Sequence, residues 1–91
     1  MLTLQHRVAV CDDVIFRALG EESVILSLDT GMYFGLDPVG TRIWALLADR
    51  NLEQVADVIH QEFDAELPQI QQDLLALVEQ LVEKRLVQPT P

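Results

Sequence analysis

The sequence of 91 residues is poor in cysteine and in positive charge, and each shortage excludes a class of protein. The single cysteine, Cys11, rules out an intrachain disulfide framework and suits a reducing compartment, so we expect a cytoplasmic protein. Six Lys and Arg residues stand against 15 Asp and Glu residues, which gives a net charge of −9. Because phosphate attraction needs clustered cations, this balance argues against binding to nucleic acid or to an anionic membrane.

Long hydrophobic runs are also missing. No apolar stretch reaches the about 18 residues of a transmembrane helix, and the start, MLTLQHRVAVCDD, lacks the cationic and apolar regions of a signal peptide. Nevertheless 49% of the residues are hydrophobic, which is enough to offset the entropy of ordering the chain. We therefore expect one small domain over residues 1–91, with an ordered core over about residues 7–87.

The part of the chain before Pro38 is expected to form strands. Short β-rich runs lie there, and the turns between them carry Gly or Asp, as tight antiparallel connections do. The runs are 8–10, 14–19, 24–28 and 32–36. In the third run, Val24, Leu26 and Leu28 recur with a period of two, which is typical of a strand with one buried face. We predict a three-stranded antiparallel meander with a short additional piece at Val8.

After Pro38 the apolar spacing becomes helical. Asp37 is a good N-cap, and Pro38 suits the first helical position because its missing N–H costs nothing there. Helical spacing then predicts three helices, over 38 to about 50, 52 to about 64, and about 68 to 85. The segment 89–91 is expected to be a loose tail. The predicted fold class is therefore α+β, with the meander followed by three α-helices, as in a winged helix-turn-helix.

The third predicted helix carries a broad apolar stripe. At about 100° per residue, its apolar residues cover roughly 180° of the helix, against the roughly 100° typical of a surface helix. The stripe consists of Leu67, Ile70, Leu74, Leu75, Leu77, Val78, Leu81 and Val82. Two interpretations stay open at this point. Either the helix lies centrally in the core, or one edge of the stripe packs inward while the other lines a groove for a partner.

The segment 32–36 is an edge strand if the strands of the meander follow in sequence. Edges usually carry Lys, Pro or a bulge that prevents pairing, but this one consists of Met32, Tyr33, Phe34, Gly35 and Leu36. Either the start of the chain, around residues 4–10, covers this edge, or the edge accepts an added strand. An open edge beside an apolar helix is the physical basis of peptide capture.

Few residues are of a kind that carries catalysis or holds a cofactor. His6 and His60 are far apart in the sequence, and no Cys or His spacing matches a metal site. A lone cysteine in or beside a strand, such as Cys11, is usually buried and inert. We therefore expect that the protein is not an enzyme and that it holds no cofactor and no metal. A winged-helix regulator that binds DNA stays as an alternative, although the acidic third helix argues against it.

The stretch VILSLDTGMYFGLDPVGTRIWALL resembles the PqqD-like family, whose members are also called RiPP precursor peptide recognition elements. Its recognisable parts are a hydrophobic strand, then Asp29-Thr30-Gly31, Tyr33-Phe34, Leu36-Asp37-Pro38-Val39-Gly40 and Ile43-Trp44-Ala45-Leu46-Leu47. Downstream, NLEQVADVIHQEF and LVEKRLVQ resemble the second helix of the family and its closing leucine-rich turn. The likeness runs from residue 8 to residue 87, and the ordered combination of these parts carries it.

This resemblance implies a non-catalytic domain that binds the leader segment of a ribosomally made precursor peptide and presents it to modifying enzymes. The leader would add as an antiparallel strand to the third strand of the meander, beside the third helix. Carried over by position, the implied peptide-binding residues are Met32, Tyr33, Phe34, Gly35, Leu36, Ile70, Asp73, Leu74, Leu77, Val78 and Leu81. Acidic Asp73 would meet a basic residue of the leader.

Within the family, the turn residues look like those of the stand-alone proteins of lasso-peptide clusters. The quinone-cofactor branch tends to carry a proline-glutamate turn where this sequence has Leu28-Asp29-Thr30. A lasso assignment implies two partners, the leader peptide and a transglutaminase-like cysteine protease that removes it. Two alternatives remain: a chaperone for a radical enzyme, and a structural subunit whose edge strand is buried in a homodimer.

Overall fold

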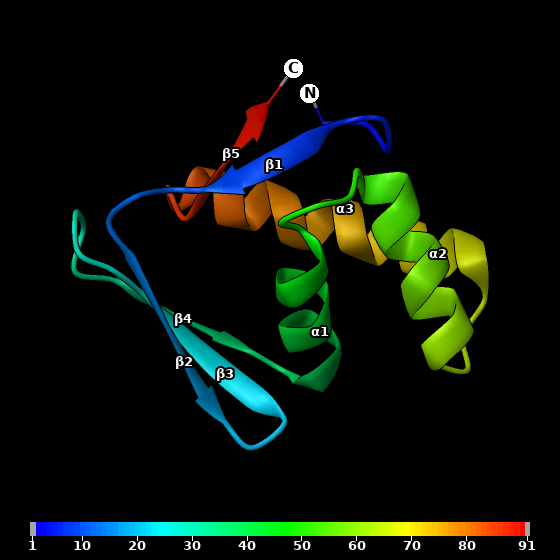
Figure 1. Ribbon diagram of the computed structural model, residues 1–91, viewed down its shortest axis with the longest axis horizontal. Helices are drawn as coiled ribbons and strands as arrows, with labels where there is room; N and C mark the ends of the chain where they lie inside the picture. The colour runs from blue at the N-terminus through cyan, green and yellow to red at the C-terminus, as the bar shows by residue number, and fades with distance from the viewer. Residues whose placement is uncertain (1, 91) are drawn as a thin grey trace.

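The computed structural model describes residues 2–90 and places the strands of a small sheet before the helices. The elements are β1 (Arg7–Val10), β2 (Val14–Leu19), β3 (Glu22–Ser27), β4 (Tyr33–Leu36), α1 (Pro38–Leu46), α2 (Leu52–Glu62), α3 (Leu67–Glu83) and β5 (Val87–Thr90). The strands β2, β3 and β4 form an antiparallel sheet in that order, beside the three helices (Figure 1). The predicted α+β order is confirmed.

The end of the chain differs from the prediction. A loose tail over 89–91 is wrong for its described part, because β5 pairs antiparallel with β1 (Figure 1); Pro91 lies outside the described residues. Val87 is buried and anchors β5 to the core. Pro89, which cannot donate to a ladder, is tolerated because each strand of a two-stranded ribbon has a free side. The piece predicted at Val8 therefore belongs to a second sheet, apart from the meander.

The helices cover the less apolar face of β3. Ser23, Ile25 and Ser27 point inward and are buried, whereas Val24 and Leu26 lie on the opposite side and stay partly exposed. We call the side of the three-stranded sheet that is turned away from the helices the outer face. The period of two predicted from the sequence is present, but Val24 and Leu26 lie on this outer face, and the buried face is that of Ile25.

Hydrogen bonds explain why two serines occupy the buried face. Ser23 Oγ lies 2.8 Å from Thr41 Oγ1 of α1. Ser27 Oγ accepts a hydrogen bond of 3.2 Å from the N–H of Thr30, in the turn before β4. Because buried polar groups need partners, these two contacts fix which face of β3 turns inward. They also tie β3 to α1 and to the turn that leads into β4.

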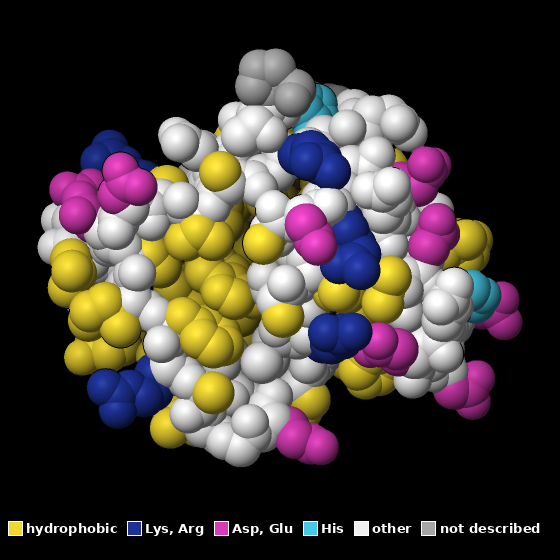
Figure 2. Space-filling model, viewed as in Figure 1, with side chains coloured by type: hydrophobic (Ala, Val, Ile, Leu, Met, Phe, Trp, Pro, Cys, Tyr) yellow, Lys and Arg dark blue, Asp and Glu magenta, His cyan; other side chains and the backbone are white. Residues whose placement is uncertain are grey.

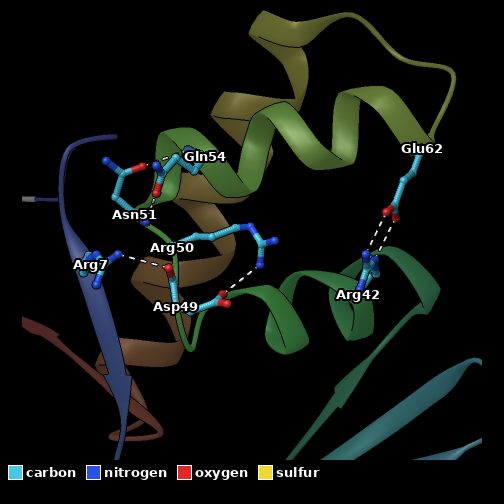
Figure 3. A network of polar contacts seen from close by, with 7 residues as sticks. All are labelled: Arg7, Arg42, Asp49, Arg50, Asn51, Gln54 and Glu62. Carbon is cyan, nitrogen blue, oxygen red and sulfur yellow. Dashed lines mark hydrogen bonds and ion pairs between the residues drawn. The ribbon is translucent and has the colours of Figure 1, made fainter.

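The starts of α1 and α2 are held by side-chain caps. Asp37 Oδ1 accepts a hydrogen bond of 2.7 Å from the N–H of Gly40, and Pro38 is the first residue of α1, as predicted. At the start of α2, the side chains of Asn51 and Gln54 each bond the other residue's backbone N–H (Figure 3). Caps of this kind contribute about 1 kcal/mol each, and they fix where each helix begins relative to the sheet.

Apolar side chains are also visible where the sheet meets α1. Phe16 of β2 stacks on Trp44 of α1, with ring centroids 6.1 Å apart and planes inclined by 5°. Figure 2 shows hydrophobic side chains gathered in a hollow between the sheet and α1.

Within residues 2–90, none of the helices combines the length and the apolar character that a membrane span requires.

The end of α3 gives a first testable prediction. Arg85 has a φ of 63°, in the left-handed region that costs non-glycine residues about 1 kcal/mol or more. Its ion pair with Asp29, 3.5 Å long and exposed on both sides, returns at most about 1 kcal/mol. We expect Arg85→Gly to raise the free energy of unfolding by about 0.5–1 kcal/mol, measured by urea unfolding.

Gly20 serves as the reverse control for this experiment. Its φ is 70° and a Cβ there would meet no atom within 4 Å, so Gly20→Ala changes backbone strain alone. We expect it to lower the free energy of unfolding by about 1 kcal/mol. A loss of stability in Arg85→Gly would mean that the ion pair outweighs the strain.

Candidate functional site

The strand β4 lies at an open edge of the sheet. The order of the sheet is β2-β3-β4, and β1 pairs with β5 instead. Of the two possibilities left open by the sequence, the start of the chain therefore does not cover this edge. Among residues 2–90 no strand pairs with the free side of β4.

The free side of β4 presents the backbone of Tyr33 and Gly35. The N–H of Ser27 donates to the C=O of Met32 at 3.0 Å, which marks a hydrogen-bonded pair of the β3–β4 ladder. In an antiparallel ladder such pairs alternate with pairs that are not bonded to each other. Continued along the register, this alternation turns the backbone of Phe34 toward β3 and that of Tyr33 and Gly35 toward the open edge.

A groove of about 610 Å³ runs between this edge strand and α3. Residues of α1 and of the end of α2 complete its lining, which is mostly hydrophobic. Of the α3 stripe, Ile70, Leu74 and Leu77 line this groove. The residues Ile70, Leu74, Val78 and Leu81 are buried in the core, while Leu67, Leu75, Leu77 and Val82 are half-buried at its margins.

The structure brings most of the predicted peptide-binding residues together. Those that line the groove are Phe34, Gly35, Leu36, Ile70, Asp73, Leu74 and Leu77. Val78 and Leu81 are 0% exposed and support the α3 wall from within the core. Met32 and Tyr33, 53% and 71% exposed, do not line the groove. The backbone N–H and C=O of Tyr33 instead point to the open edge of the sheet.

Sequence reasoning missed the part of the lining that comes from α1, from the α2–α3 connection and from the far end of α3. Val39 and Ile43 of α1 line the groove, as do Phe63, Ala65 and Gln80. The spacing of four residues between Val39 and Ile43 puts both on one helix face, so a signal was present. Phe63 and Ala65 reach the groove only through the packing of α2 on α3, which no local pattern encodes.

Polar groups stand among these apolar walls. Asp37 is committed to the cap of α1, and Asp73 Oδ1 accepts a hydrogen bond of 2.9 Å from Gln69 Nε2. Both aspartates line the groove, which therefore combines hydrophobic walls with negative charge. In the described part of the chain, no three His, Cys, Asp or Glu side chains are grouped as a metal ion would need.

An ion pair joins α1 to the end of α2, near the lining residue Phe63. Arg42 donates from Nε and Nη2 to the two carboxylate oxygens of Glu62, both at 2.8 Å (Figure 3). The hydrogen bonds from Arg42, aided by its charge, lower the pKa of Glu62, and the same contact raises the pKa of Arg42. The pair thus holds together two elements that line the groove.

This ion pair predicts a dependence of stability on pH. A carboxyl group whose pKa is lower in the folded state stabilises the fold above its ordinary pKa, and this stabilisation is lost as the pH falls. We expect Glu62→Gln to lower the urea midpoint slightly at pH 7, because both side chains are partly exposed. The difference from the wild type should vanish below about pH 4.

The exposed Glu79 of α3 provides the control for this measurement. We expect Glu79→Gln to show no comparable change of the urea midpoint between pH 7 and about pH 3. If the effect of Glu62→Gln persisted at about pH 3, the ion pair with Arg42 would not be its cause.

Comparisons with known proteins match the part of the chain that forms the groove. A family model described as "Coenzyme PQQ synthesis protein D (PqqD)" matches residues 22–87, a range that includes β3, β4 and the three helices. Among solved structures, "TbiB1 in Complex with the TbiA(beta) Leader Peptide" is similar over 87% of this chain and 93% of that chain, with 38% sequence identity and a TM-score of 0.81. Among curated proteins, a search gives no match.

Proposed function

The chain belongs to the PqqD family, and from this premise we propose that it binds the leader segment of a ribosomally made precursor peptide without catalysing a reaction. The leader adds as an antiparallel strand to β4. The observation that carries the proposal is the open edge at Tyr33 and Gly35, beside a hydrophobic groove of about 610 Å³. The similar protein TbiB1, whose structure is a complex with a leader peptide, supports it.

Strand addition fixes which leader side chains enter the groove. A strand bonded to the backbone of Tyr33 and Gly35 places its intervening residues opposite Phe34 and Leu36. Directly opposite residues share a face of a sheet, and Phe34 and Leu36 point to the groove. Two leader residues, separated by one, therefore place their side chains between β4 and Leu77 of α3. Backbone bonds supply affinity, and this pair of side chains supplies specificity.

The charge of the groove favours a particular leader composition. Asp73 of α3 lies among the hydrophobic lining residues, on a chain of net charge −9. A Lys or Arg next to the two apolar groove-facing residues would gain attraction from Asp73, mainly at low ionic strength. We therefore expect the leader to combine apolar residues at alternate positions with a basic neighbour.

Within this proposed function, we assign the protein to lasso-peptide biosynthesis. In this proposal the protein delivers the bound leader to a transglutaminase-like cysteine protease, which removes it. Two observations support this assignment: the sequence has Leu28-Asp29-Thr30 in place of a proline-glutamate turn, and it is 38% identical to TbiB1. Delivery to a radical enzyme is the competing assignment. The open reading frames beside the gene distinguish the two, because a protease gene is expected only in the first case.

Titration of a labelled leader peptide tests the proposed function. The peptide is taken from the precursor encoded beside the gene, and fluorescence anisotropy is followed as the protein is added. We expect saturable binding with a Kd of about 10 µM or tighter, and no saturation with a scrambled leader. Equal anisotropy of the two peptides up to about 200 µM protein would refute leader binding.

A further inference from the structure

The two walls of the groove run in opposite directions. The ion pair of 3.5 Å between Arg85 and Asp29 puts the end of α3 beside the turn that leads into β4. At the other end, the ion pair between Arg42 and Glu62 puts α1, which follows β4, beside the end of α2, which precedes α3 (Figure 3). Accordingly, Figure 1 shows the start of α3, in yellow, at the end of α2 and its end, in orange, toward the β3–β4 turn. An added strand antiparallel to β4 therefore runs in the same direction as α3.

One face of α3 follows the groove from end to end. Asp73, Leu77 and Gln80 of this face line the groove. Glu66, the N-cap of α3, stands seven residues before Asp73, and Lys84, its C-cap, stands four residues after Gln80. Residues at these spacings lie on one side of a helix. The groove face of α3 therefore begins with acidic side chains and ends with a lysine.

The end of the groove at the start of α3 is acidic. Asp64 and Glu66 stand on either side of the lining residue Ala65, and both are exposed. Asp73 is also exposed and lines the groove. None of these three carboxylates forms an ion pair within residues 2–90. Their charges are therefore available to a ligand at this end.

The opposite end of the groove carries positive charge. Lys84 is exposed and forms no ion pair in the described part of the chain. The neighbouring Arg85 and Asp29 offset each other through their ion pair. Glu83 is adjacent in sequence, but one residue turns a helix by about 100°, so Glu83 lies off the groove face. Lys84 is therefore the charge that a ligand meets at this end.

Backbone hydrogen bonds alone do not fix the direction of an added strand. Both parallel and antiparallel strands can pair with an open edge, and antiparallel pairing is only slightly more stable per residue. The charges distinguish the two directions. In the antiparallel direction, the N-terminal part of the leader lies at Glu66 and Asp73, and its C-terminal part lies at Lys84. In the parallel direction these two parts are exchanged.

We propose that the opposite charges of the two groove ends select the direction of the bound leader. This inference rests on the proposed function. The leader carries Lys or Arg before its groove-binding residues and Asp or Glu after them, so that both ends attract it in the antiparallel direction. A leader with the reverse order of charges meets like charges at both ends. Binding parallel would restore the attraction but reverse the order of its groove-facing side chains.

Two peptides of identical composition test the inference. Both contain the groove-binding segment of the leader encoded beside the gene. The first peptide has two lysines before this segment and two glutamates after it, and the second has the reverse. Because the peptides have equal net charge, the protein's net charge of −9 acts on both alike. Fluorescence anisotropy gives the two Kd values at an ionic strength of about 0.01 M, where charges act over about 30 Å.

The expected result is a preference for the first peptide. We expect it to bind at least about tenfold more tightly than the second, and the difference to vanish at about 1 M salt, where charges act over only about 3 Å. Equal affinities at low salt, or tighter binding of the second peptide, overturn the inference, as does a preference that persists at high salt. Absence of binding by both peptides and by the unmodified leader would instead refute the proposed function.

Lys84→Glu tests whether the effect arises at the end of α3. The exposed side chain changes sign, so the ratio of the two affinities should fall from about tenfold to about threefold or less. Arg17→Glu is the matched control, because it changes the net charge equally on β2, which β3 separates from β4. It should leave the ratio unchanged. Equal effects of the two variants would mean that net charge alone acts, and would overturn the role of Lys84.

Asp73→Asn makes the corresponding test at the acidic end. Asparagine keeps the size of the side chain and an oxygen that can accept the hydrogen bond from Gln69, so the change removes the charge. We expect the affinity ratio to fall about twofold. Asp57→Asn changes an exposed residue of α2 that does not line the groove, and it should leave the ratio unchanged. A ratio that Asp73→Asn does not alter overturns the role of Asp73.

Discussion

Tyr33→Pro is expected to weaken leader binding strongly while the sheet stays folded. The N–H of Tyr33 faces the open edge, so its loss takes a donor from the added strand and from no strand of the protein itself. The proline ring also blocks the approach of the peptide backbone. Together these effects should weaken binding by about 2–3 kcal/mol, or about 30–150-fold. Fluorescence anisotropy with the labelled leader measures the change.

Two control variants separate this effect from loss of structure. Tyr33→Ala keeps the N–H and should retain binding within about threefold. Ala18→Pro makes the same change on β2, where the 2.8 Å bond from Leu28 N–H to Asp13 C=O and the register turn the Ala18 backbone to the other free edge. It should retain leader binding. A folded Tyr33→Pro variant, by circular dichroism, with wild-type affinity would remove β4 from the site.

Leu77→Asp is expected to have an effect of similar size through the other wall of the groove. Leu77 is half-buried on α3 and lines the groove opposite β4. A carboxylate at this position would be desolvated against the apolar leader side chains that enter there. We expect leader affinity to fall at least about 30-fold, a loss of about 2 kcal/mol or more.

Leu75 provides a closely matched control for this variant. It is a leucine on the same helix and is half-buried, as Leu77 is, but it does not line the groove. Leu75→Asp and Leu77→Asp should each lower the free energy of unfolding by about 1–3 kcal/mol, while only Leu77→Asp weakens leader binding. Equal loss of binding in both variants would point to a general disturbance of α3.

The order of the elements was predictable from local chemistry, whereas the sequence left open whether the start of the chain covers the edge strand. The turn residues Asp29 and Gly31 separate two strands, and Asp37 followed by Pro38 starts a helix, whatever the rest of the fold. The breadth of the apolar stripe on α3 left two interpretations open, a central position in the core or a groove along one edge of the stripe. Each of these signals acts over a few residues, which is the range at which sequence patterns are informative.

The features that were missed depend on contacts between distant residues. The pairing of β5 with β1 joins Arg7 to Thr90, and neither segment carries a local signal for the other. The inward turn of Ser23 depends on a hydrogen bond with Thr41 of another element. Phe63 reaches the groove through helix packing. In each case tertiary contacts decide what local hydrophobicity leaves open.

The open edge of β4 also has a consequence for colloidal behaviour. Every free molecule presents the same unpaired backbone groups, and such edges are templates for pairing between copies. The net charge of −9 opposes this self-association through mutual repulsion. Salt shortens the reach of that repulsion to about 10 Å at 0.1 M ionic strength. The scarcity of Lys and Arg therefore keeps the edge accessible in dilute buffer, and a bound peptide protects it when salt is high.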